Sequence, residues 1–491
     1  MLLNPKMLEV NTRIWLKQFS NVNRISDIPD QYIESLNSKG IKILWLMGAW
    51  KTSKALAERC CFGANMIPEY IKALSDWKKE DVIGSPFAID DYILNPAFGE
   101  EAELLTFKEK LNKKGIKLFL DFIPNHFGAD STIIKSHPGI FLQTDKDSYL
   151  KDPYAFYEYN HNTPIYIAHG RDPFFPPWTD TAQLNFFADE ARDFLIDKLI
   201  YISTIADGVR CDMAMLPLNN VFQNTWSGVL NKLIFKKPHD EFWQTAIKKT
   251  KQSRPDFIFL AEAYWGLEWN LQQLGFDYTY DKTLTDRLST DDIPGIKGHL
   301  LAENDFQVKS VRFIENHDEQ RAAKKFGTYK SLAAAVVIST IKGVHFYYDG
   351  QFEGKKTKLP VQLGREPVEK ISQQVLKFYD ALLEITNDEI FKNGNWQLLY
   401  PEPAGNADSS SENILAWQWQ LKNEFRIIVI NYSNIISRCR LKLEISAGKH
   451  SIKFEDLLTN KIYERSSEEI KYPGLFIELK GYQSHIFCIK P

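Results

Sequence analysis

Apolar and polar positions repeat in one order along the first three-quarters of the chain. Residues 38–42, Ser-Lys-Gly-Ile-Lys, lead into the apolar run 43–47, and Lys-Gly-Ile-Lys at 114–117 leads into a second run at 118–120. In both places apolar residues at helical spacing precede a glycine, Gly40 or Gly115, where a helix C-cap favours positive φ. A short, nearly continuous apolar run is typical of a strand buried on both faces. The pattern therefore predicts a helix, a glycine cap and a buried strand in turn.

The same unit recurs with variation, so that the sequence predicts eight strands. They are expected at residues 12–16, 43–47, 118–120, 207–211, 257–261, 276–280, 311–314 and 344–348. Helices that alternate with buried parallel strands indicate an α/β fold, and eight units over about 350 residues favour a closed (β/α)8 TIM barrel. An open doubly wound sheet usually carries a glycine fingerprint after its first strand, and this sequence has none there.

Two regions interrupt the pattern. Residues 127–184 are rich in Pro, Tyr, Asp and His and lack the helix–strand alternation; long insertions of this kind often carry function. From about residue 393, alternating apolar and polar runs separated by turn residues predict β-structure. We therefore expect a barrel of residues 1–126 and 185–388, an inserted loop-rich subdomain at 127–184 after the third strand, and a C-terminal all-β sandwich domain at 389–491.

Composition and charge narrow the class of protein. The 491 residues are 44% hydrophobic and 25% charged, as in globular proteins, and the net charge of −3 provides no field to attract nucleic acid or an anionic membrane. Five cysteines without metal-binding spacing indicate neither a disulfide framework nor a zinc site. We see no signal peptide and no apolar run long enough to span a membrane, so we expect a cytoplasmic protein. Its oligomeric state stays open.

Polar residues gather directly after four of the predicted strands. Active sites of such barrels lie at the carboxyl ends of the strands. Taken singly, an aspartate after an apolar run is most often a helix N-cap, and a histidine there is most often structural. Several acids that converge on one rim are unfavourable unless the site uses them. The residues that we expect at this rim are Asp121, His126, Arg210, Asp212, Glu262, His317 and Asp318.

The order of these motifs resembles the α-amylase superfamily of retaining glycoside hydrolases, glycoside hydrolase family 13. The matching segments are residues 121–126, 208–212, 262–265 and 313–318, with Asp91-Tyr92 upstream and Gln183-Leu184-Asn185 at the end of the insertion. The resemblance spans about residues 12–355, and a C-terminal β-domain fits the usual tail of the family. Four motifs in this order on the expected strands are far more specific than any one of them.

The resemblance implies a role for each matching residue. Asp212 would be the nucleophile, Glu262 the general acid/base, and Asp318 would bind sugar hydroxyls and help to distort the ring. Phe87 stands where the family usually has a tyrosine that stacks on the sugar, so it can stack but cannot form a hydrogen bond. The substrate-binding residues implied are Arg210, His126, His317, Phe87 and Asp91.

The chemistry of two carboxyls supports this assignment independently. A retaining glycosidase needs one ionised and one protonated carboxyl about 5–5.5 Å apart. Arg210 lies two residues before Asp212 and therefore shares its face of the strand. We expect Arg210 to keep Asp212 ionised, and burial beside other acids to raise the pKa of Glu262.

The sequence says less about the cofactor, the substrate and the reaction than about the fold. Many α-amylases carry Lys-His three and four residues after the nucleophile, where this chain has Met215 and Leu216, although Asn125 matches one calcium ligand of the family. We expect no cofactor, with calcium as the alternative, and a small-molecule carbohydrate as the binding partner.

Three readings of the function stay open. The first is hydrolysis, by double displacement, of α-glucosidic bonds in small oligosaccharides or α-glucans. Glucosyl transfer to a sugar or to phosphate uses the same residues, and a non-catalytic relative normally lacks one of the acids. Within the insertion, Trp178 and the pair Phe174-Phe175 are candidate sugar-contacting rings, with packing onto the barrel as the alternative.

Overall fold

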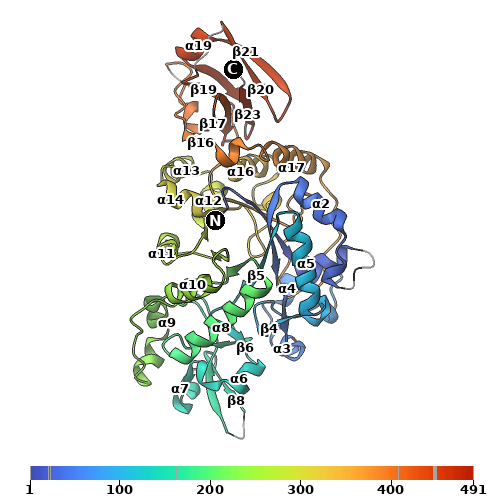
Figure 1. Ribbon diagram of the computed structural model, residues 1–491, viewed down its shortest axis with the longest axis vertical. Helices are drawn as coiled ribbons and strands as arrows, with labels where there is room; N and C mark the ends of the chain where they lie inside the picture. Colours follow the sequence, from blue (N-terminus) through green and yellow to red (C-terminus); the bar gives the residue numbers. More distant parts are fainter. Residues whose placement is uncertain are drawn as a thin grey trace.

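The computed structural model describes residues 2–19, 22, 24–160, 163–406, 408–445 and 450–489. Eight parallel strands close into a barrel at its centre, which confirms the predicted TIM barrel (Figure 1). The barrel strands, each hydrogen-bonded to the next and the last to the first, are β1 (Lys6–Asn11), β2 (Ile41–Met47), β5 (Lys117–Phe122), β11 (Gly208–Cys211), β12 (Ile258–Ala261), β13 (Tyr278–Tyr280), β14 (Ser310–Arg312) and β15 (Val344–Tyr348).

Helices on the outside connect these strands (Figure 1). Gly40 and Gly115 follow the helices α2 and α5 with φ of +77° and +69°, as the sequence predicts. The helices of this layer are α2 (Asp30–Ser38), α5 (Glu101–Lys113), α8 (Asp189–Ile205), α9 (Asn219–Lys232), α10 (Phe242–Ser253), α11 (Glu268–Gln273), α12 (Lys282–Ser289), α13 (Ile293–His299), α14 (Asn304–Lys309), α15 (Ala322–Lys325), α16 (Thr328–Thr340), α17 (Gln373–Ile385) and α18 (Ile390–Asn393).

The interior of the barrel changes from apolar to charged towards the carboxyl ends of the strands. Inward-facing residues such as Met7, Phe119 and Leu260 form one buried apolar cluster. Because side chains alternate along a strand, the residues two positions further on also point inward. For these strands they include Glu9, Asp121 and Glu262. The fold therefore aims charged side chains into the same end of the barrel.

The first barrel strand is not where the sequence analysis places it. Residues 12–16 were expected to form it, but the strand is β1, and Thr12–Trp15 is the short helix α1. The reason is that β1 carries two buried charged residues, Lys6 and Glu9, which interrupt its apolar run. The ammonium of Lys6 donates to the carbonyl of Leu383 at 2.6 Å, and this hydrogen bond compensates for its burial. A hydropathy pattern does not predict that a lysine is buried in this way.

Two excursions follow the strands β2 and β5. The first contains β3 (Trp50–Thr52), α3 (Lys54–Cys60), α4 (Ile67–Ala73) and β4 (Ile89–Leu94), and β3 pairs with β4. The sequence analysis did not anticipate it, because its paired strands are short. The second, expected excursion forms small antiparallel sheets from β6 (His126–Gly128), β7 (Gln143–Thr144), β8 (Phe156–Tyr159), β9 (Ile165–Ala168) and β10 (Thr181–Gln183), with the helices α6 (Thr132–Ser136) and α7 (Lys146–Lys151).

The C-terminal part is built from antiparallel sheets, as expected. A six-stranded sheet and the two-stranded sheet β19–β22 share one buried apolar cluster. The other face of the larger sheet packs against the barrel beside α16 (Figure 1). There the indoles of Trp417 and Trp419 both donate to the carbonyl of Thr340 at the end of this helix. The elements are β16 (Asn395–Leu398), β17 (Ile414–Leu421), β18 (Glu424–Asn431), β19 (Ser437–Leu441), β20 (Ser451–Asp456), β21 (Lys461–Ser466), α19 (Ser467–Lys471), β22 (Leu475–Leu479) and β23 (Ser484–Ile489).

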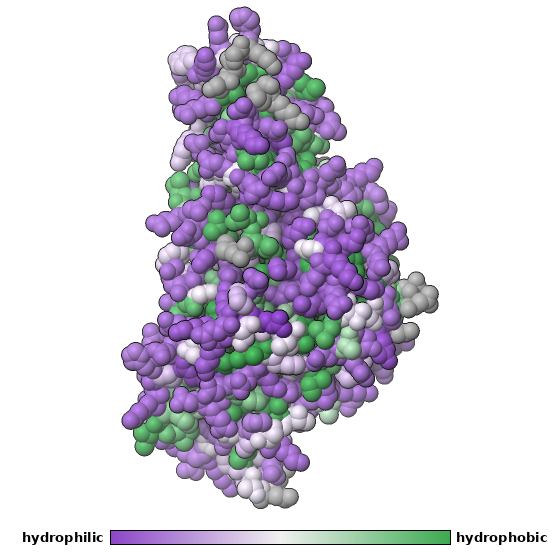
Figure 2. Space-filling model, viewed as in Figure 1, coloured by the Kyte–Doolittle hydropathy of each residue, from purple (hydrophilic) through white to green (hydrophobic). Residues whose placement is uncertain are grey.

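The surface is mainly polar on the face shown in Figure 2, with apolar residues scattered in small groups. Among the described residues, we find no helix with the length and apolar character needed to cross a membrane.

Trp419 provides a test of the contact between the C-terminal sheet and the barrel. The side chain is 1% exposed, so Trp419→Ala should lower the free energy of unfolding by about 3–5 kcal/mol through lost burial. Trp419→Phe should cost less, about 1 kcal/mol for the lost hydrogen bond, because most of the packing stays. Urea unfolding followed by circular dichroism measures both. Tyr400→Ala is the control, since Tyr400 is 70% exposed, and equal effects of Trp419→Ala and Tyr400→Ala would contradict the contact.

Candidate active site

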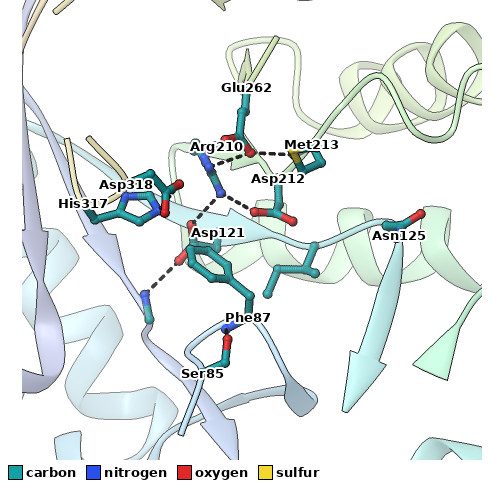
Figure 3. A network of polar contacts seen from close by, with 12 residues as sticks. Ser85, Phe87, Asp121, Asn125, Arg210, Asp212, Met213, Glu262, His317 and Asp318 are labelled. Atoms are coloured by element: carbon teal, nitrogen blue, oxygen red, sulfur yellow. Dashed lines mark hydrogen bonds and ion pairs between the residues drawn. The ribbon is translucent and has the colours of Figure 1, made fainter. Parts of the chain in front are cut away.

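Residues from several barrel strands meet at one rim of the barrel. Asp121 lies on β5, Arg210 lies on β11, and Asp212 and Glu262 directly follow β11 and β12. Parallel strands point their carboxyl ends to the same side, so these residues become neighbours although they are far apart in sequence. Figure 3 shows Asp121, Asp212 and Glu262 around the guanidinium of Arg210. The structure therefore brings the predicted acids together.

Arg210 occupies the centre of this cluster. Its side chain has no exposed surface, and its two terminal nitrogens, Nη1 and Nη2, lie 2.7 Å from Oδ1 of Asp212 and 2.7 Å from Oε2 of Glu262. Nη1 also lies 3.8 Å from Oδ1 of Asp121. The sequence predicts the first of these contacts but not the second. One guanidinium is thus shared between both proposed catalytic carboxyls.

Aromatic rings surround the same guanidinium. Its central carbon lies 5.1 Å from the ring centre of Trp45, 5.5 Å from that of Phe87 and 5.9 Å from that of Tyr280. The electron-rich faces of such rings attract a cation, most strongly where water is absent. Phe87, predicted to stack on a sugar, therefore also packs beside Arg210.

Burial sets the protonation of the paired carboxyls. It raises the pKa of Asp212 and of Glu262, and the charge of Arg210 opposes the rise at both without cancelling it. Arg210 acts on Asp212 in the expected direction, since its charge and hydrogen bond favour the ionised form, but the loss of water outweighs the ion pair and the net shift of the Asp212 pKa is upward. The predicted rise at Glu262 has the expected direction. Burial likewise raises the pKa of Asp121 to about 7.

Two further groups fix the carboxyl of Glu262. The backbone N–H of Met213 donates to Oε2 at 2.7 Å, and the hydroxyl of Tyr264 donates to Oε1 at 2.8 Å. Met213 has a φ of +41°, in the left-handed region that residues other than glycine rarely adopt. The sequence analysis missed both partners, although Tyr264 follows Glu262 by two residues in the same motif.

His317 and Asp318 form a second charged group beside the first. Nε2 of His317 lies 3.0 Å from Oδ2 of Asp318, whose side chain is 51% exposed, and Nδ1 lies 2.5 Å from Oε1 of Glu9. Burial acts to lower the pKa of His317, but Asp318 and Glu9 together raise it well above its ordinary value. Burial acts to raise the pKa of Asp318, but His317 lowers it. These opposite shifts favour an imidazolium paired with an ionised carboxylate.

The remaining predicted residues lie in different places. His126 is buried, and its ring centre lies 5.4 Å from that of Trp178 in the insertion, while burial lowers its pKa to about 3. Asp91 is not brought into the cluster, because its Oδ1 accepts from the ammonium of Lys198 on α8 at 2.6 Å. Phe174 is 68% exposed and contacts Trp265, which lies three residues after Glu262, with 5.1 Å between ring centres.

A cavity of about 310 Å³ opens beside His317 and Asp318. Residues Asn65, Met66 and Tyr70, around α4, line one wall, and residues 358–362 of the loop after β15 line the other. The ammonium of Lys358 donates to the backbone carbonyl of Asp318. The exposed carboxyl of Asp318 therefore borders a space with polar walls.

The residues that would bind calcium by resemblance do not fit such a site. Oδ1 of Asn125 accepts from Nε2 of Gln183 at 2.9 Å, while Met215 and Leu216 are buried among apolar residues. Within the part of the chain that the structure describes, we find no group of three or more His, Cys, Asp or Glu side chains arranged to hold a metal.

Comparison with known proteins identifies relatives of this architecture. Residues 78–398 match the family model of the alpha-amylase catalytic domain. The chain is 21% identical over 295 residues to Alpha-amylase 3 of Dictyoglomus thermophilum, over 57% of this chain and 55% of that protein. It is 22% identical over 267 residues to a cyclomaltodextrin glucanotransferase of Bacillus sp. (strain 17-1), over 52% of this chain and 36% of that protein. The matched part is about half the length of these relatives, or less.

A solved structure resembles the whole chain. The noncanonic maltogenic alpha-amylase AmyB from Thermotoga neapolitana superposes with a TM-score of 0.70 over 99% of this chain and 98% of that one. The two sequences are 18% identical, so this likeness concerns the fold.

Removing Arg210 tests the electrostatics of the cluster. Arg210→Met should lower the free energy of unfolding by about 3–5 kcal/mol at pH 8, because it leaves two buried carboxylates unpaired. Carboxyls whose pKa is raised in the folded state keep their protons as the pH falls, so the loss should be smaller at pH 5. Thermal unfolding at pH 5, 6.5 and 8 measures this. Arg438→Met, which removes a surface ion pair with Glu478, is the control, and a loss that is equal at every pH would contradict the interpretation.

Proposed function

Because the chain belongs to the alpha-amylase catalytic-domain family, we propose that it is a retaining glycoside hydrolase that cleaves α-glucosidic bonds in α-glucans or small oligosaccharides. The observation that carries the proposal is the sharing of one guanidinium, Arg210, by the carboxyls of Asp212 and Glu262. A guanidinium shared by both carboxyls favours the short separation that a covalent intermediate needs, since an inverting enzyme needs a wider gap to admit a water between them.

In the first step Asp212 acts as the nucleophile. Its carboxylate attacks the anomeric carbon, the bond to the glycosidic oxygen breaks, and Glu262 gives its proton to that oxygen. Nη1 of Arg210 donates a hydrogen bond to Asp212 at 2.7 Å, which favours the ionised form of this carboxyl. The two carboxyls titrate as a pair, and the single proton between them belongs on Glu262 in the reactive state.

In the second step Glu262 acts as a base. It accepts a proton from a water molecule whose oxygen attacks the anomeric carbon, and the bond to Asp212 breaks. The product keeps the configuration of the substrate because the carbon is attacked twice from opposite sides. The Met213 N–H and the Tyr264 hydroxyl stabilise Glu262 in its ionised form between the two steps.

The substrate binds beside these carboxyls. Asp318 is ionised and half-exposed, so that it can accept hydrogen bonds from sugar hydroxyls. The adjoining cavity of about 310 Å³ offers room for further sugar on the same side. Phe87 packs 5.4 Å from His317 and presents an apolar ring to the sugar face.

Glucosyl transfer is a second candidate reaction. Trp265, three residues after Glu262, is 39% exposed, and Phe174, which contacts its ring, is 68% exposed. Exposed rings of this kind bind sugar faces and would hold an acceptor sugar in place of water. The similarity to a cyclomaltodextrin glucanotransferase points in the same direction. Transfer to phosphate uses the same first step.

A non-catalytic relative is disfavoured. Such a protein has no need of raised pKa values at Asp212 and Glu262, yet both acids and their shared arginine are present. Release of nitrophenol from a nitrophenyl α-glucoside separates the two cases. Sugar binding without turnover of any substrate in a panel of disaccharides and malto-oligosaccharides would favour the non-catalytic relative.

Substitution of the two carboxyls should separate their roles. Asp212→Asn should abolish turnover of every substrate, because no covalent intermediate can form. Glu262→Gln should lower kcat/KM by about 10²–10⁴-fold for malto-oligosaccharides and far less for aryl glucosides with good leaving groups, which need no proton. Steady-state kinetics and product chromatography measure both effects.

Asp277→Asn is the matched control for these variants. Asp277 pairs with Lys251 before β13, at the opposite end of the barrel from the cluster. It should keep near wild-type turnover, and thermal unfolding should show that Asp212→Asn is folded. Near-normal turnover by folded Asp212→Asn would refute the nucleophile.

The first-formed anomer tests the stereochemistry. Proton NMR during cleavage of maltotriose should show the α-anomer first, followed by slow mutarotation. Added glucose or phosphate should leave the product unchanged for a hydrolase, and should yield new glycosides or glucose 1-phosphate for a transferase or a phosphorylase. An initial β-anomer would rule out the double displacement.

A further inference from the structure

Glu9 is a buried carboxyl that the proposed reaction does not use. It lies on β1 with no exposed surface, at the end of the barrel where the catalytic carboxyls gather. Oε1 contacts the imidazole of His317 at 2.5 Å, across 308 positions of sequence. Oε2 is buried and has no hydrogen-bond partner among the described residues. Burying a carboxylate with one unpartnered oxygen costs free energy of folding. This cost indicates that the one strong contact of Glu9 has a role.

The contact is the first link of a chain of three groups. His317 stands between Glu9 at Nδ1 and Asp318 at Nε2, with distances of 2.5 Å and 3.0 Å. Nδ1 lies within hydrogen-bond distance of Glu9, whereas Nε2 lies 3.0 Å from Oδ2 of Asp318 as an ion pair without hydrogen-bond geometry. Two carboxylates that flank one imidazole favour its charged form. We therefore expect His317 to be an imidazolium in this arrangement.

The surroundings hold the imidazole in place. Its ring centre lies 5.7 Å from that of Trp45 and 5.4 Å from that of Phe87, and the side chain of His317 is 1% exposed. Asp318, by contrast, has a half-exposed side chain that could otherwise turn freely in water. The buried ring therefore gives the half-exposed carboxylate a fixed partner.

We propose that Glu9 is a positioning residue of the active site, which keeps His317 charged and thereby fixes the carboxylate of Asp318 for the substrate. The inference rests on the proposed function for the role of Asp318. Glu9 itself does not touch the sugar, because His317 lies between it and Asp318.

The charge of Glu9 is essential to this arrangement. The imidazolium loses solvation on burial, and the two flanking carboxylates restore its stability. Removing one of them while keeping its shape should lower the pKa of His317 by about 1–3 units. Above the new pKa the ring is neutral, so it no longer attracts the carboxylate of Asp318 as a cation. The other charged or titratable groups that act on Glu9, His317 and Asp318 include Asp121 on β5, Arg210 and Asp212 on and after β11, Tyr280 on β13, Glu315 after β14, Tyr348 on β15 and Lys358 beside Asp318.

Glu9→Gln is the decisive variant, because it keeps the length and the acceptor oxygen but removes the charge. The pKa of His317 can be measured by NMR with ¹⁵N-labelled histidine, and His317→Asn identifies its signal among the ten histidines. In the wild type both nitrogens of His317 should be protonated at pH 7.5. In Glu9→Gln the pKa should fall by about 1–3 units.

The kinetic readout is the ratio of kcat/KM between variant and wild type at each pH. For Glu9→Gln the ratio should be near one at acidic pH and fall as the pH passes the lowered pKa of His317. The ratio removes the titration of Glu262, which both proteins share. Glu9→Asp keeps the charge but lacks reach, so it should lower kcat/KM evenly across pH.

The C-terminal sheets contain a matched control. Asp456 is fully buried, and its Oδ2 contacts Nδ1 of His485 at 2.9 Å, the same chemistry outside the barrel. Asp456→Asn should reduce thermal stability without altering the pKa of His317 or the pH dependence of kcat/KM.

The outcomes separate the two proposals. A neutral His317 in the wild type at pH 7.5, an unchanged pKa in Glu9→Gln, or a flat activity ratio would overturn the role of Glu9. A shift of the pH dependence in Asp456→Asn equal to that in Glu9→Gln would also overturn it, because the effect would then be global. If the wild type turns over no sugar, the proposed function fails, while the pKa of His317 still decides whether Glu9 holds it charged.

Discussion

Arg210 carries a full positive charge inside the barrel, with no exposed side-chain surface, and three carboxyl groups approach it. Each of these charges alone would lose several kcal/mol on leaving water. Together they are held by the register of the sheet, because Arg210 pairs with Asp121 across β5 and β11 and with Leu260 across β11 and β12. Glu262 lies two residues beyond Leu260 on the same face. The barrel therefore places the charges, and the ion pairs in turn make their burial tolerable.

A second cation divides the acids into two kinds. His317 is paired with Asp318 and lowers the pKa of that carboxyl. The single charge of Arg210 is shared by Asp212 and Glu262, so the pKa values of both stay raised by burial. Exposure follows the same division, since the side chain of Asp318 is 51% exposed and that of Glu262 is 3% exposed. Under the proposed function, the carboxyl that binds sugar, Asp318, stays ionised near water, and the carboxyl that holds the proton, Glu262, is kept dry. Glu9 belongs to this division because it stabilises the second cation.

The sequence predicts the parts of this site that follow a regular apolar run. Asp212 and Glu262 each follow such a run. Because active sites of these barrels lie at the carboxyl ends of the strands, the strand ends alone predict that the two acids are neighbours. Glu9 escaped notice because its charge breaks the run of β1, and the first strand was expected six residues too late for the same reason. Asp91 sits in a matching motif, but whether it reaches the site or pairs with Lys198 depends on packing that hydropathy does not encode.

Backbone geometry links Asp212 to Glu262, and sequence patterns say nothing of it. The N–H of Met213, next to Asp212, donates to the side chain of Glu262, and the N–H of Ala214 donates to its backbone carbonyl at 3.1 Å. The left-handed φ of Met213 is a strained conformation at this junction. Together with the shared guanidinium, these bonds tie the end of β11 to the end of β12 at three points. The gap between the two carboxyls is thus set by the main chain and a buried arginine, and that gap is the quantity that decides between retention and inversion.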